Sequence, residues 1–407
     1  MKLSWFNRTM VIERRCENAR SMACQGTTEM TEEARFDIAV VGAGIAGASL
    51  AARLAGHRSV VLLERESQPG YHSTGRSAAM FMESYGPPAV RALTRASRQF
   101  YLGPPDGFTD VPLLAPRGAL YLAQTGQQDL LHKLRLELQD SCPELRQLDR
   151  AQVLETVACL RPENTYVGLL DSMAMDIDVH ALHQGFLRQM RRDGGVLHTN
   201  AEVLAARREQ GFWQLELAGA TRVQAQVVVN AAGAWADQLG SLFGARAIGL
   251  VPHRRSAFTF RPPQDLDTAA WPVVTSVSES WYFKPDAGVL LGSPANADAM
   301  QPHDVAPEEI DIATAIHYIE AATTMQIRRP LRSWAGLRSF VPDGELVIGW
   351  DNRCDGFFWL AAQGGYGIQS APAASELAAS LVLQAPLPES MRQHGVDPAA
   401  MSPLRLS

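Results

Sequence analysis

The sequence predicts an α/β fold in which a Rossmann-like dinucleotide-binding domain is built from separated segments, with a second, mixed-sheet α+β domain inserted between them. Three glycine-rich junctions between a strand and a helix lead to this prediction. The first follows a buried strand at residues 36–41, the second covers residues 230–237, and the third covers residues 363–369. Because the first and third junctions stand near opposite ends of the chain, we expect one long cofactor to be held at both of its ends.

The first junction carries a complete dinucleotide fingerprint. Gly42 permits a tight turn after the strand, Gly44 lets the backbone approach a pyrophosphate, and Gly47 lets the helix pack closely on the strand. A second apolar strand at residues 59–63 ends on Glu64, whose carboxylate can accept both hydroxyls of a ribose. The same carboxylate would repel a 2′-phosphate, so the pattern disfavours NADP.

The remaining elements follow from hydrophobic periodicity and from glycine, proline and capping residues. After a small-residue loop at 70–79, helices are expected near 88–101, 127–139, 150–157, 178–192 and 307–323, and the segment 363–369 is expected to open a last helix that reaches about residue 383. Asp178 is the expected N-cap of the fourth of these helices. Strands are expected near 196–208, 212–218, 223–230, 346–350 and 357–361, with antiparallel strands between 250 and 300.

Composition limits the classes of function. The 407 residues are 46% hydrophobic, enough for a large core, and the net charge of −6 gives no general attraction to nucleic acid. The apolar stretches are shorter than the roughly 18 residues that span a membrane. Five cysteines without a CxxC pair indicate reduced thiols in a cytoplasm and no metal site. Residues 1–35 are polar and arginine-containing, so we expect a disordered extension rather than a secretory signal.

Seven blocks of sequence carry a resemblance to a known family. They are residues 71–79 (YHSTGRSAA), 181–186 (ALHQGF), 230–235 (NAAGAW), 254–258 (RRSAF), 284–298 (KPDAGVLLGSPANAD), 334–341 (WAGLRSFV) and 361–369 (AAQGGYGIQ). On these blocks, from residue 36 onwards, the chain resembles the D-amino acid oxidase superfamily of FAD-dependent oxidoreductases, and within it the bacterial D-arginine dehydrogenases. The resemblance implies FAD-binding segments at 36–84, 176–245 and 336–407, and substrate-domain segments at 85–175 and 246–335.

The resemblance also implies which residues hold FAD. The fingerprint glycines would hold the ADP half with Glu64 and Arg65, the loop at 73–79 would lie along the pyrophosphate, and Val203 would lie near the adenine. Residues 364–369 would meet the flavin pyrimidine end, where a helix N-terminus favours negative charge. The full set is Gly42, Gly44, Ala46, Gly47, Glu64, Arg65, Ser73, Thr74, Arg76, Ser77, Ala78, Ala79, Val203, Ala232, Gly233, Gly364, Gly365, Tyr366, Gly367, Ile368 and Gln369.

The reaction implied by the resemblance is oxidative deamination of a D-amino acid. A hydride would pass from Cα to flavin N5, and the imine would hydrolyse to a 2-oxo acid and ammonia. Arg338, Arg255 and Tyr282 would hold the α-carboxylate, because the planar guanidinium pairs with a carboxylate through two hydrogen bonds. Arg254 is adjacent to Arg255 and would face the other way on a strand. The resemblance further places Tyr85 as a lid over the pocket and Gly365 beside the reacting atoms.

Two departures from the D-arginine enzymes bear on the substrate. Ala119 stands where those enzymes have a glutamate that pairs with the guanidinium, and Met80 stands where they have a histidine. Because a buried cation without its anion is strongly disfavoured, we expect neutral or apolar D-amino acids to be preferred over D-arginine. Glu83, in the lid segment 80–85, is an alternative anion or else a solvated surface charge.

Several alternatives stay open at this level. The enzyme could oxidise another secondary amine or a 2-hydroxy acid, or it could use NAD. A catalytically lapsed flavoprotein with a binding role is an alternative of another class. The resemblance favours a dehydrogenase that passes electrons to a quinone or another carrier, with O2 as the other acceptor.

Overall fold

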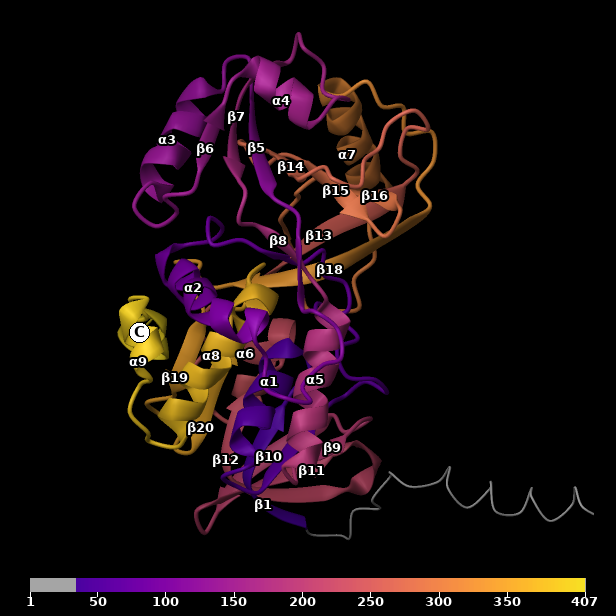
Figure 1. The fold of residues 1–407 in the computed structure, drawn as a ribbon. Coiled ribbons are helices and arrows are strands. Elements are labelled where there is room, and N and C mark those ends of the chain that lie inside the picture. Colours follow the sequence, from indigo (N-terminus) through magenta and orange to yellow (C-terminus); the bar gives the residue numbers. More distant parts are fainter. Residues whose placement is uncertain (1–33, 407) are drawn as a thin grey trace, which may run out of the picture.

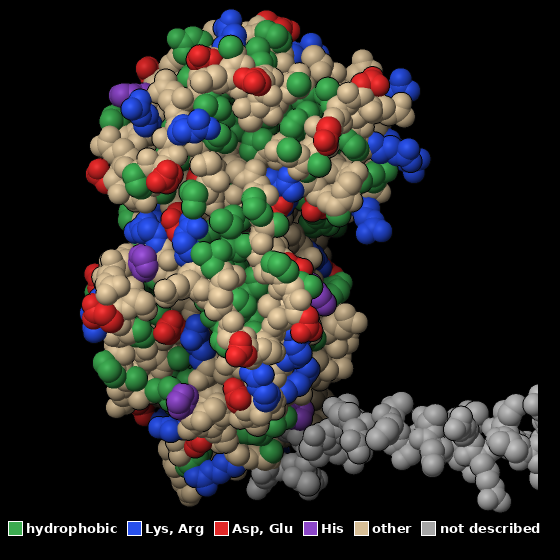
Figure 2. All heavy atoms as spheres, in the orientation of Figure 1, with side chains coloured by type: hydrophobic (Ala, Val, Ile, Leu, Met, Phe, Trp, Pro, Cys, Tyr) green, Lys and Arg blue, Asp and Glu red, His purple; other side chains and the backbone are tan. Residues whose placement is uncertain are grey.

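The computed structural model describes residues 34–406 and shows two lobes joined by a narrower waist (Figure 1). The described chain begins at the bottom of the lower lobe in that view, and its C-terminal end lies on the side of the same lobe. Figure 2 shows that the surface narrows between the lobes and that hydrophobic side chains gather there. The chain crosses between the lobes several times, so each lobe contains residues that lie far apart in the sequence.

The lower lobe is built on an eight-stranded sheet. The strand order is β10-β11-β12-β1-β2-β9, with β20 beside β12 and β19 beside β20. β1 (Ala34–Val41) pairs in parallel with β2 (Val60–Leu63) and β12 (Arg222–Asn230), so the carboxyl ends of these strands meet at one edge. The other strands are β9 (Val196–His198), β10 (Val203–Glu209), β11 (Phe212–Leu217), β19 (Val347–Trp350) and β20 (Phe357–Ala361).

Both faces are buried in the middle of this sheet, which explains why β2, β20 and the second half of β1 are continuously apolar. Along β1, Ile38 and Val40 enter one core cluster, while Ala39 and Val41 enter the cluster on the opposite face. The first cluster also contains residues of α1 (Ile45–Leu54), α2 (Pro88–Leu102), α5 (Val179–Arg192) and α8 (Gly367–Val382). The second contains residues of α6 (Ala236–Leu242), and α9 (Glu389–Gln393) packs beside α2.

The upper lobe is built on a nine-stranded sheet. Its order is β17-β13-β16-β15-β14-β5-β7-β6, with β18 beside β13. The strands are β5 (Ala119–Gln124), β6 (Arg146–Leu148), β7 (Thr165–Asp171), β13 (Val251–Phe260), β14 (Val273–Ser276), β15 (Tyr282–Asp286), β16 (Val289–Ser293), β17 (Asp298–Ala299) and β18 (Arg332–Phe340). The helices of this lobe are α3 (Gln128–Leu138), α4 (Arg150–Thr156) and α7 (Glu309–Ala322).

A small three-stranded sheet lies where the chain passes between the lobes. It consists of β3 (Met80–Phe81), β8 (Met175–Ile177) and β4 (Leu114–Pro116), in that order. The long strands β13 and β18 run along the same junction (Figure 1). Four short 3-10 helices, at Ala218–Ala220, Gly233–Trp235, Pro398–Met401 and Pro403–Leu406, complete the described elements.

The architecture confirms the predicted α/β fold with a Rossmann-like domain and a second mixed-sheet domain. Asp178 caps α5 as expected, because its side chain accepts a hydrogen bond from the backbone of Ala181. The strand expected at 196–208 is two strands, β9 and β10, separated near Asn200, whose φ is +54°. β14 pairs with β5 in parallel, whereas we expected antiparallel strands throughout residues 250–300.

The expected domain limits also differ in places. Residues 34–35 belong to β1 and not to a disordered extension; the rest of that extension lies outside the described residues. α2 packs in the core of the lower lobe, although its segment was assigned to the substrate domain. β18 stays in the upper sheet as far as Phe340, because it pairs along its length with β13. No helix within residues 34–406 combines the length and apolarity that crossing a membrane requires.

Candidate functional site

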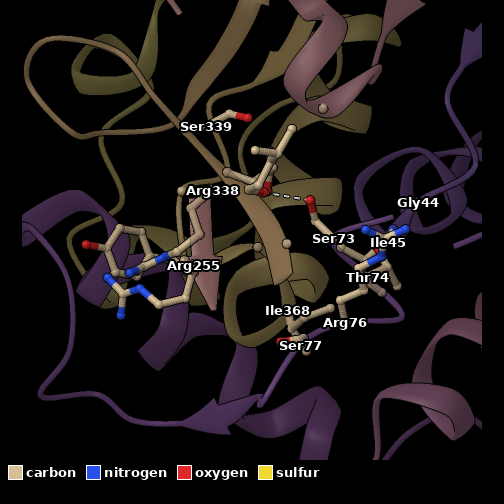
Figure 3. A pocket seen from close by; sticks show the side chains of 18 of the residues that line it. Gly44, Ile45, Ser73, Thr74, Arg76, Ser77, Arg255, Arg338, Ser339 and Ile368 are labelled. Atoms are coloured by element: carbon tan, nitrogen blue, oxygen red, sulfur yellow. Dashed lines mark hydrogen bonds between the residues drawn. The ribbon is translucent and has the colours of Figure 1, made fainter. Parts of the chain in front are cut away.

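A cavity of about 850 Å³ is lined by residues of both lobes. Its lower part lies at the carboxyl edge of β1, β2 and β12, where the predicted glycine junctions stand. Its upper part lies against β13, β15 and β18. Figure 3 shows Gly44 and Thr74 on one side of this space and Arg255 and Arg338 on the other. The cavity therefore has room for a long ligand that spans the waist.

The fingerprint glycines are required by close backbone approach. Gly42 has φ +104°, and a Cβ there would lie 2.4 Å from the carbonyl oxygen of Ala231. At Gly47 a Cβ would lie 1.9 Å from the carbonyl oxygen of Gly42. Gly47 does not line the cavity, so it acts by allowing α1 to pack on the turn. Any side chain at either position would force the backbone apart.

Two helix N-termini open onto the cavity, and neither is capped by the side chain of its own N-cap residue. The N-cap residues are Gly44 for α1 and Tyr366 for α8. Neither first turn contains an acidic residue. The partial positive charge at a helix N-terminus favours an anion or an electron-rich group. The cavity thus offers two such places, one in its lower part and one near Gly365.

Glu64 and the loop at 73–79 shape the lower part. Glu64 Oε2 accepts from the backbone of Ala43 at 2.9 Å, so the carboxylate is fixed beside the glycine turn. Thr74 Oγ1 accepts from the backbone of Ile45 at 2.9 Å, which ties the loop to the start of α1. Ser73 Oγ donates to the backbone oxygen of Leu337 at 2.6 Å, drawn as a dashed line in Figure 3. The loop therefore joins α1 to β18 along the cavity.

Six lysine and arginine side chains line the cavity, and four of them have a carboxylate partner. These pairs are Arg65–Glu66 (Nε–Oε1 3.0 Å), Arg76–Asp304 (Nη2–Oδ1 2.5 Å), Arg91–Glu137 (Nη1–Oε1 2.8 Å) and Lys284–Asp176 (Nζ–Oδ1 2.6 Å). Arg255 and Arg338 have no carboxylate partner among residues 34–406. Because an unpaired buried charge is costly, these two guanidinium groups can accept an anion from the cavity.

Arg255 and Arg338 come from neighbouring strands and share one face. Arg255 on β13 lies opposite Gly336 of β18, and Arg338 lies opposite His253, so the two arginines are diagonal neighbours. Figure 3 shows their side chains extending into the same region of the cavity. Burial lowers the pKa of the Arg255 guanidinium, and the like charge of Arg338 lowers it further. A bound carboxylate would relieve this repulsion.

Arg338 is held in place by its surroundings. Its Nη2 donates to the hydroxyl of Tyr85 at 2.9 Å. A Cβ at Gly365 would lie 1.7 Å from the same nitrogen, so the guanidinium lies directly against this glycine. The ring of Tyr85 packs edge-on against Tyr366, with centroids 5.1 Å apart. Burial, and then the nearby Tyr85, raises the pKa of Tyr366 to about 12. The lid residue and the glycine-rich loop therefore position the arginine together.

Arg254 faces away from the cavity, in agreement with strand alternation. Its guanidinium contacts Glu308, Asp311 and Asp298. Arg255 instead donates from Nε to the backbone oxygen of Asn296 at 2.7 Å and lines the cavity. The structure thus places the arginine that we selected at the cavity and uses its neighbour in an ion cluster.

Most of the predicted residues line the cavity. They are Gly42, Gly44, Ala46, Glu64, Arg65, Ser73, Thr74, Arg76, Ser77, Ala78, Ala79, Met80, Tyr85, Val203, Ala232, Gly233, Arg255, Tyr282, Arg338, Gly364, Gly365, Tyr366, Gly367, Ile368 and Gln369. Gln369 also makes three hydrogen bonds within the protein. Its amide nitrogen donates to the backbone oxygen of Tyr85 and to Thr94 Oγ1, and its amide oxygen accepts from the backbone N–H of Met82. It therefore ties the lid segment to the start of α8.

Two residues predicted for the substrate pocket do not line it. Ala119 is fully buried in the cluster behind the cavity, on the same face of β5 as Tyr121, which does line it. Glu83 pairs with Arg98 at 2.7 Å and lies outside the lining, so its charge is already neutralised on the lid. Neither residue therefore supplies or withholds a charge at the cavity surface directly.

Several lining residues were not predicted from the sequence. Tyr121, Ser84, Lys284 and Glu279 all reach the cavity, the last of them on its exposed rim with φ +53°. The sequence analysis predicts no element at residues 119–124, so it does not indicate that Tyr121 faces a ligand. Among residues 34–406 there is no cluster of His, Cys, Asp or Glu that could hold a metal ion.

Comparisons with known proteins agree with this arrangement. A family profile described as FAD dependent oxidoreductase matches residues 37–381. Glycine oxidase of Bacillus licheniformis is 25% identical over 374 residues, which cover 87% of this chain and 94% of that protein. Mitochondrial dimethylglycine dehydrogenase of Rattus norvegicus is 24% identical over 82% of this chain, and the match spans only 41% of that longer protein.

Solved structures show the same fold. The crystal structure of glycine oxidase from Geobacillus kaustophilus matches with a TM-score of 0.77 and 21% identity, over 87% of this chain and 96% of that one. Iminodiacetate oxidase from Chelativorans sp. BNC1 matches with a TM-score of 0.74 and 20% identity, over 88% of this chain and 98% of that one. L-amino acid deaminase from Proteus vulgaris also matches, with a TM-score of 0.73, 17% identity and coverage of 93% of this chain and 96% of that one.

Proposed function

The chain belongs to the family of FAD-dependent oxidoreductases, and from this premise we propose that it oxidatively deaminates D-amino acids to 2-oxo acids and ammonia. The observation that carries the proposal is the pair of unpaired guanidinium groups, Arg255 and Arg338, in a cavity where the other four lysine and arginine side chains are neutralised. A substrate carboxylate is the anion that this pair accommodates best, because two guanidinium planes offer several parallel N–H donors.

FAD is the cofactor, and the residues present fit it. The glycine turn around Gly42 and Gly44 leaves room for a pyrophosphate at the start of α1, and Glu64 is fixed where a ribose would lie. The second uncapped N-terminus, at α8, suits the electron-rich end of a reduced flavin. When bound, FAD supplies the acceptor for the hydride that leaves the substrate Cα.

The protein's own part is to bind, orient and exclude water. Arg255 and Arg338 hold the carboxylate, with Tyr282 beside them in the lining. Tyr85 belongs to the lid segment, so it closes the cavity over the substrate. Its hydroxyl also accepts a hydrogen bond from Arg338 and so fixes that arginine. Holding a reactant in one orientation supplies much of the rate enhancement in such reactions.

We propose neutral or apolar side chains for the preferred substrates. The upper part of the cavity is lined by the uncharged side chains of Met80, Met82, Tyr121, Val273 and Val277. The carboxylate of Glu279 also belongs to the lining, but it lies on the exposed rim. The preference for the D enantiomer rests on the resemblance of the sequence blocks to D-arginine dehydrogenases. A dehydrogenase that passes electrons to a quinone or another carrier is proposed on the same basis, with O2 as the alternative acceptor.

A second candidate is an N-substituted glycine or another secondary amine that bears a carboxylate. The names of the relatives favour it, since dimethylglycine dehydrogenase and iminodiacetate oxidase are named for such compounds. Such a substrate would use the same pair, Arg255 and Arg338. We also propose a cytoplasmic location, because Cys142, Cys159 and Cys354 are free thiols.

An anaerobic titration of the purified flavoprotein tests these proposals. Absorbance of the oxidised flavin is followed during addition of D and L pairs of methionine, leucine, phenylalanine and arginine. Glycine, N-methylated glycines, iminodiacetate, a 2-hydroxy acid and an amine without a carboxylate complete the panel. Bleaching by neutral D-amino acids supports the proposal, and bleaching chiefly by D-arginine contradicts the side-chain preference. Bleaching by the L enantiomers or by N-substituted glycines alone transfers the assignment to those substrates, and bleaching by none favours a binding role.

A further inference from the structure

A hydrogen-bonded chain leads from the upper cavity into the protein interior. Ser84 Oγ donates to Asp171 Oδ2 at 2.6 Å, and the hydroxyl of Tyr121 lies 3.0 Å from Ser84 Oγ. Tyr121 and Ser84 line the cavity, whereas Asp171 is only 5% exposed and does not. The three residues come from β5, the lid segment and the end of β7. The chain therefore connects the substrate space with a buried carboxylate.

The direction of these hydrogen bonds depends on the proton of Asp171. An ionised carboxylate only accepts, so Ser84 gives it its single proton, and Tyr121 must then donate to Ser84. In that state the Tyr121 oxygen offers a lone pair to the cavity. If Asp171 is protonated, it donates to Ser84, Ser84 donates to Tyr121, and the Tyr121 proton turns toward the cavity. The hydrogen-bonded chain can therefore run in either of two directions, and the two arrangements differ by one proton on Asp171.

The surroundings of Asp171 favour proton uptake. Its carboxylate has no cationic partner among residues 34–406, and its other oxygen accepts from the backbone of Met173 at 2.9 Å. Burial raises the pKa of the Asp171 carboxyl. The nearby carboxylate of Glu83, which pairs with Arg98, acts in the same direction. The other titratable groups near the chain are Tyr85, beside Tyr121, and the Cys142 thiol, whose pKa burial also raises.

The proposed reaction needs such an acceptor. An amino acid carries its amine as an ammonium group near neutral pH, and the ammonium must lose a proton before its Cα can release a hydride. Arg255 and Arg338 serve the carboxylate, and Lys284 is paired with Asp176, so none of these cations accepts a proton. The Tyr121 oxygen offers a lone pair to the cavity, and its own proton can pass through Ser84 to Asp171.

We propose that Tyr121, Ser84 and Asp171 form a proton relay that accepts the proton of the substrate ammonium group. This proposal rests on the proposed function. One N–H bond of the ammonium breaks and its proton passes to the Tyr121 oxygen. The Tyr121 proton passes to Ser84 Oγ, and the Ser84 proton passes to Asp171 Oδ2, where the new O–H bond forms. The amine keeps the electron pair, and no electron is transferred in this step. When the product leaves, the proton returns by the reverse path to water that enters the cavity.

The test compares the pH dependence of kcat/KM in Tyr121→Phe, Ser84→Ala and Asp171→Asn with that of the wild-type holoenzyme. Each substitution breaks the chain at a different point. We expect kcat/KM at pH 7 to fall by about 10²-fold or more, the usual contribution of a positioned acid–base group. The loss should shrink at alkaline pH, where the substrate amine is already neutral. The double variant Tyr121→Phe/Asp171→Asn should lose no more than either single variant, because the residues act as one unit.

Ser256→Ala provides a matched control. Ser256 is also a buried serine that donates to a buried aspartate, Asp311, at 2.6 Å, but neither residue lines the cavity. We expect Ser256→Ala to lose about as much thermal stability as Ser84→Ala, while the pH profile of its kcat/KM stays that of the wild type. If Asp171→Asn does not fold, Tyr121→Phe decides the matter, because it keeps the ring and removes only the hydroxyl.

The outcomes separate the relay from the proposed function. If amino acids reduce the wild-type flavin but the pH profiles of kcat/KM in the variants run parallel to the wild-type profile, the relay is refuted and the proposed function stands. Loss at neutral pH that alkaline pH restores supports the relay, since a purely structural role would lower kcat/KM at every pH. If no amino acid or secondary amine reduces the wild-type flavin, the proposed function fails and the relay fails with it.

Discussion

Gly365→Ala provides a direct test of the carboxylate receptor, because it displaces Arg338 without removing it. A Cβ at Gly365 would lie 1.7 Å from Nη2, 2.3 Å from Cζ and 2.4 Å from Nε of Arg338. Ordinary van der Waals separation is about 3.5–4.0 Å, so the guanidinium must retreat by about 2 Å. The displaced atoms are the end of a long side chain, and Gly365 has no positive φ, so the fold should tolerate the change.

The magnitude follows from the bonds that the retreat breaks. A shift of about 2 Å ends both the 2.9 Å bond from Arg338 to Tyr85 and any bond to a substrate carboxylate. A hydrogen bond to a charged group contributes about 1.5–3 kcal/mol. With Arg255 still present, we expect a loss of about 2–4 kcal/mol, which raises KM roughly 30-fold to 1,000-fold. Arg338→Ala should give an effect of similar size.

The assay measures KM and kcat for a D-amino acid, together with flavin content and melting temperature. Gly56→Ala is the matched control, because Gly56 lies outside the cavity and has nothing within 4 Å of its Cβ position. For an amine that lacks the carboxylate, Gly365→Ala should leave KM nearly unchanged. A variant that keeps its flavin and shows wild-type KM for amino acids would refute the assignment of Arg338 to the carboxylate.

Three further changes follow from the same structure. Gly47→Ala should cost about 1–3 kcal/mol and lower the flavin-to-protein ratio, because its Cβ would lie 1.9 Å from the backbone oxygen of Gly42; full flavin occupancy would contradict this. Ala119→Glu should destabilise the protein by about 3–5 kcal/mol through an uncompensated buried charge, as chemical denaturation would show, and a gain of D-arginine turnover would instead place this position at the cavity. The hydrogen bond from Arg405 lowers the pKa of the Asp343 carboxyl in the folded protein. The ion pair therefore stabilises the fold fully above the ordinary carboxyl pKa of about 4, and this stabilisation is lost as the pH falls through the lower pKa of the folded state. Arg405→Met should therefore cost about 0.5–1 kcal/mol at pH 7 in urea unfolding and much less in acid, and a gap that persists in strong acid would exclude the ion pair as its cause.

Local features of the chain were readable from the sequence because their physical causes are local. The turn at Gly42 needs a positive φ, Gly47 needs a close helix, and Asp178 needs only the N–H groups of the helix that follows it. Such requirements act within a few residues, so the pattern of glycines, caps and apolar alternation predicts them. The elements of the dinucleotide-binding domain therefore lie close to where the sequence predicts them, and most of the residues predicted for its site line the cavity.

The sequence did not predict which residues of the two lobes face each other across the waist. Ala119 and Tyr121 share one face of β5, yet only Tyr121 lines the cavity, whereas Ala119 is fully buried. The salt bridge of Glu83 with Arg98 depends on where α2 packs. Alternation gives the face of a strand, but the depth along that face depends on contacts between distant segments.

By itself the sequence determined the fold class, the glycine turns, the choice of a long dinucleotide and which arginines we propose for a carboxylate. Only the tertiary structure decided which charges remain unpaired. The pairing of Lys284 with Asp176 joins β15 to β8, while Arg255 and Arg338 face the cavity without a carboxylate partner among residues 34–406. A charge is neutralised by whichever group lies within a few ångströms of it, and that distance is set by packing between segments far apart in the chain.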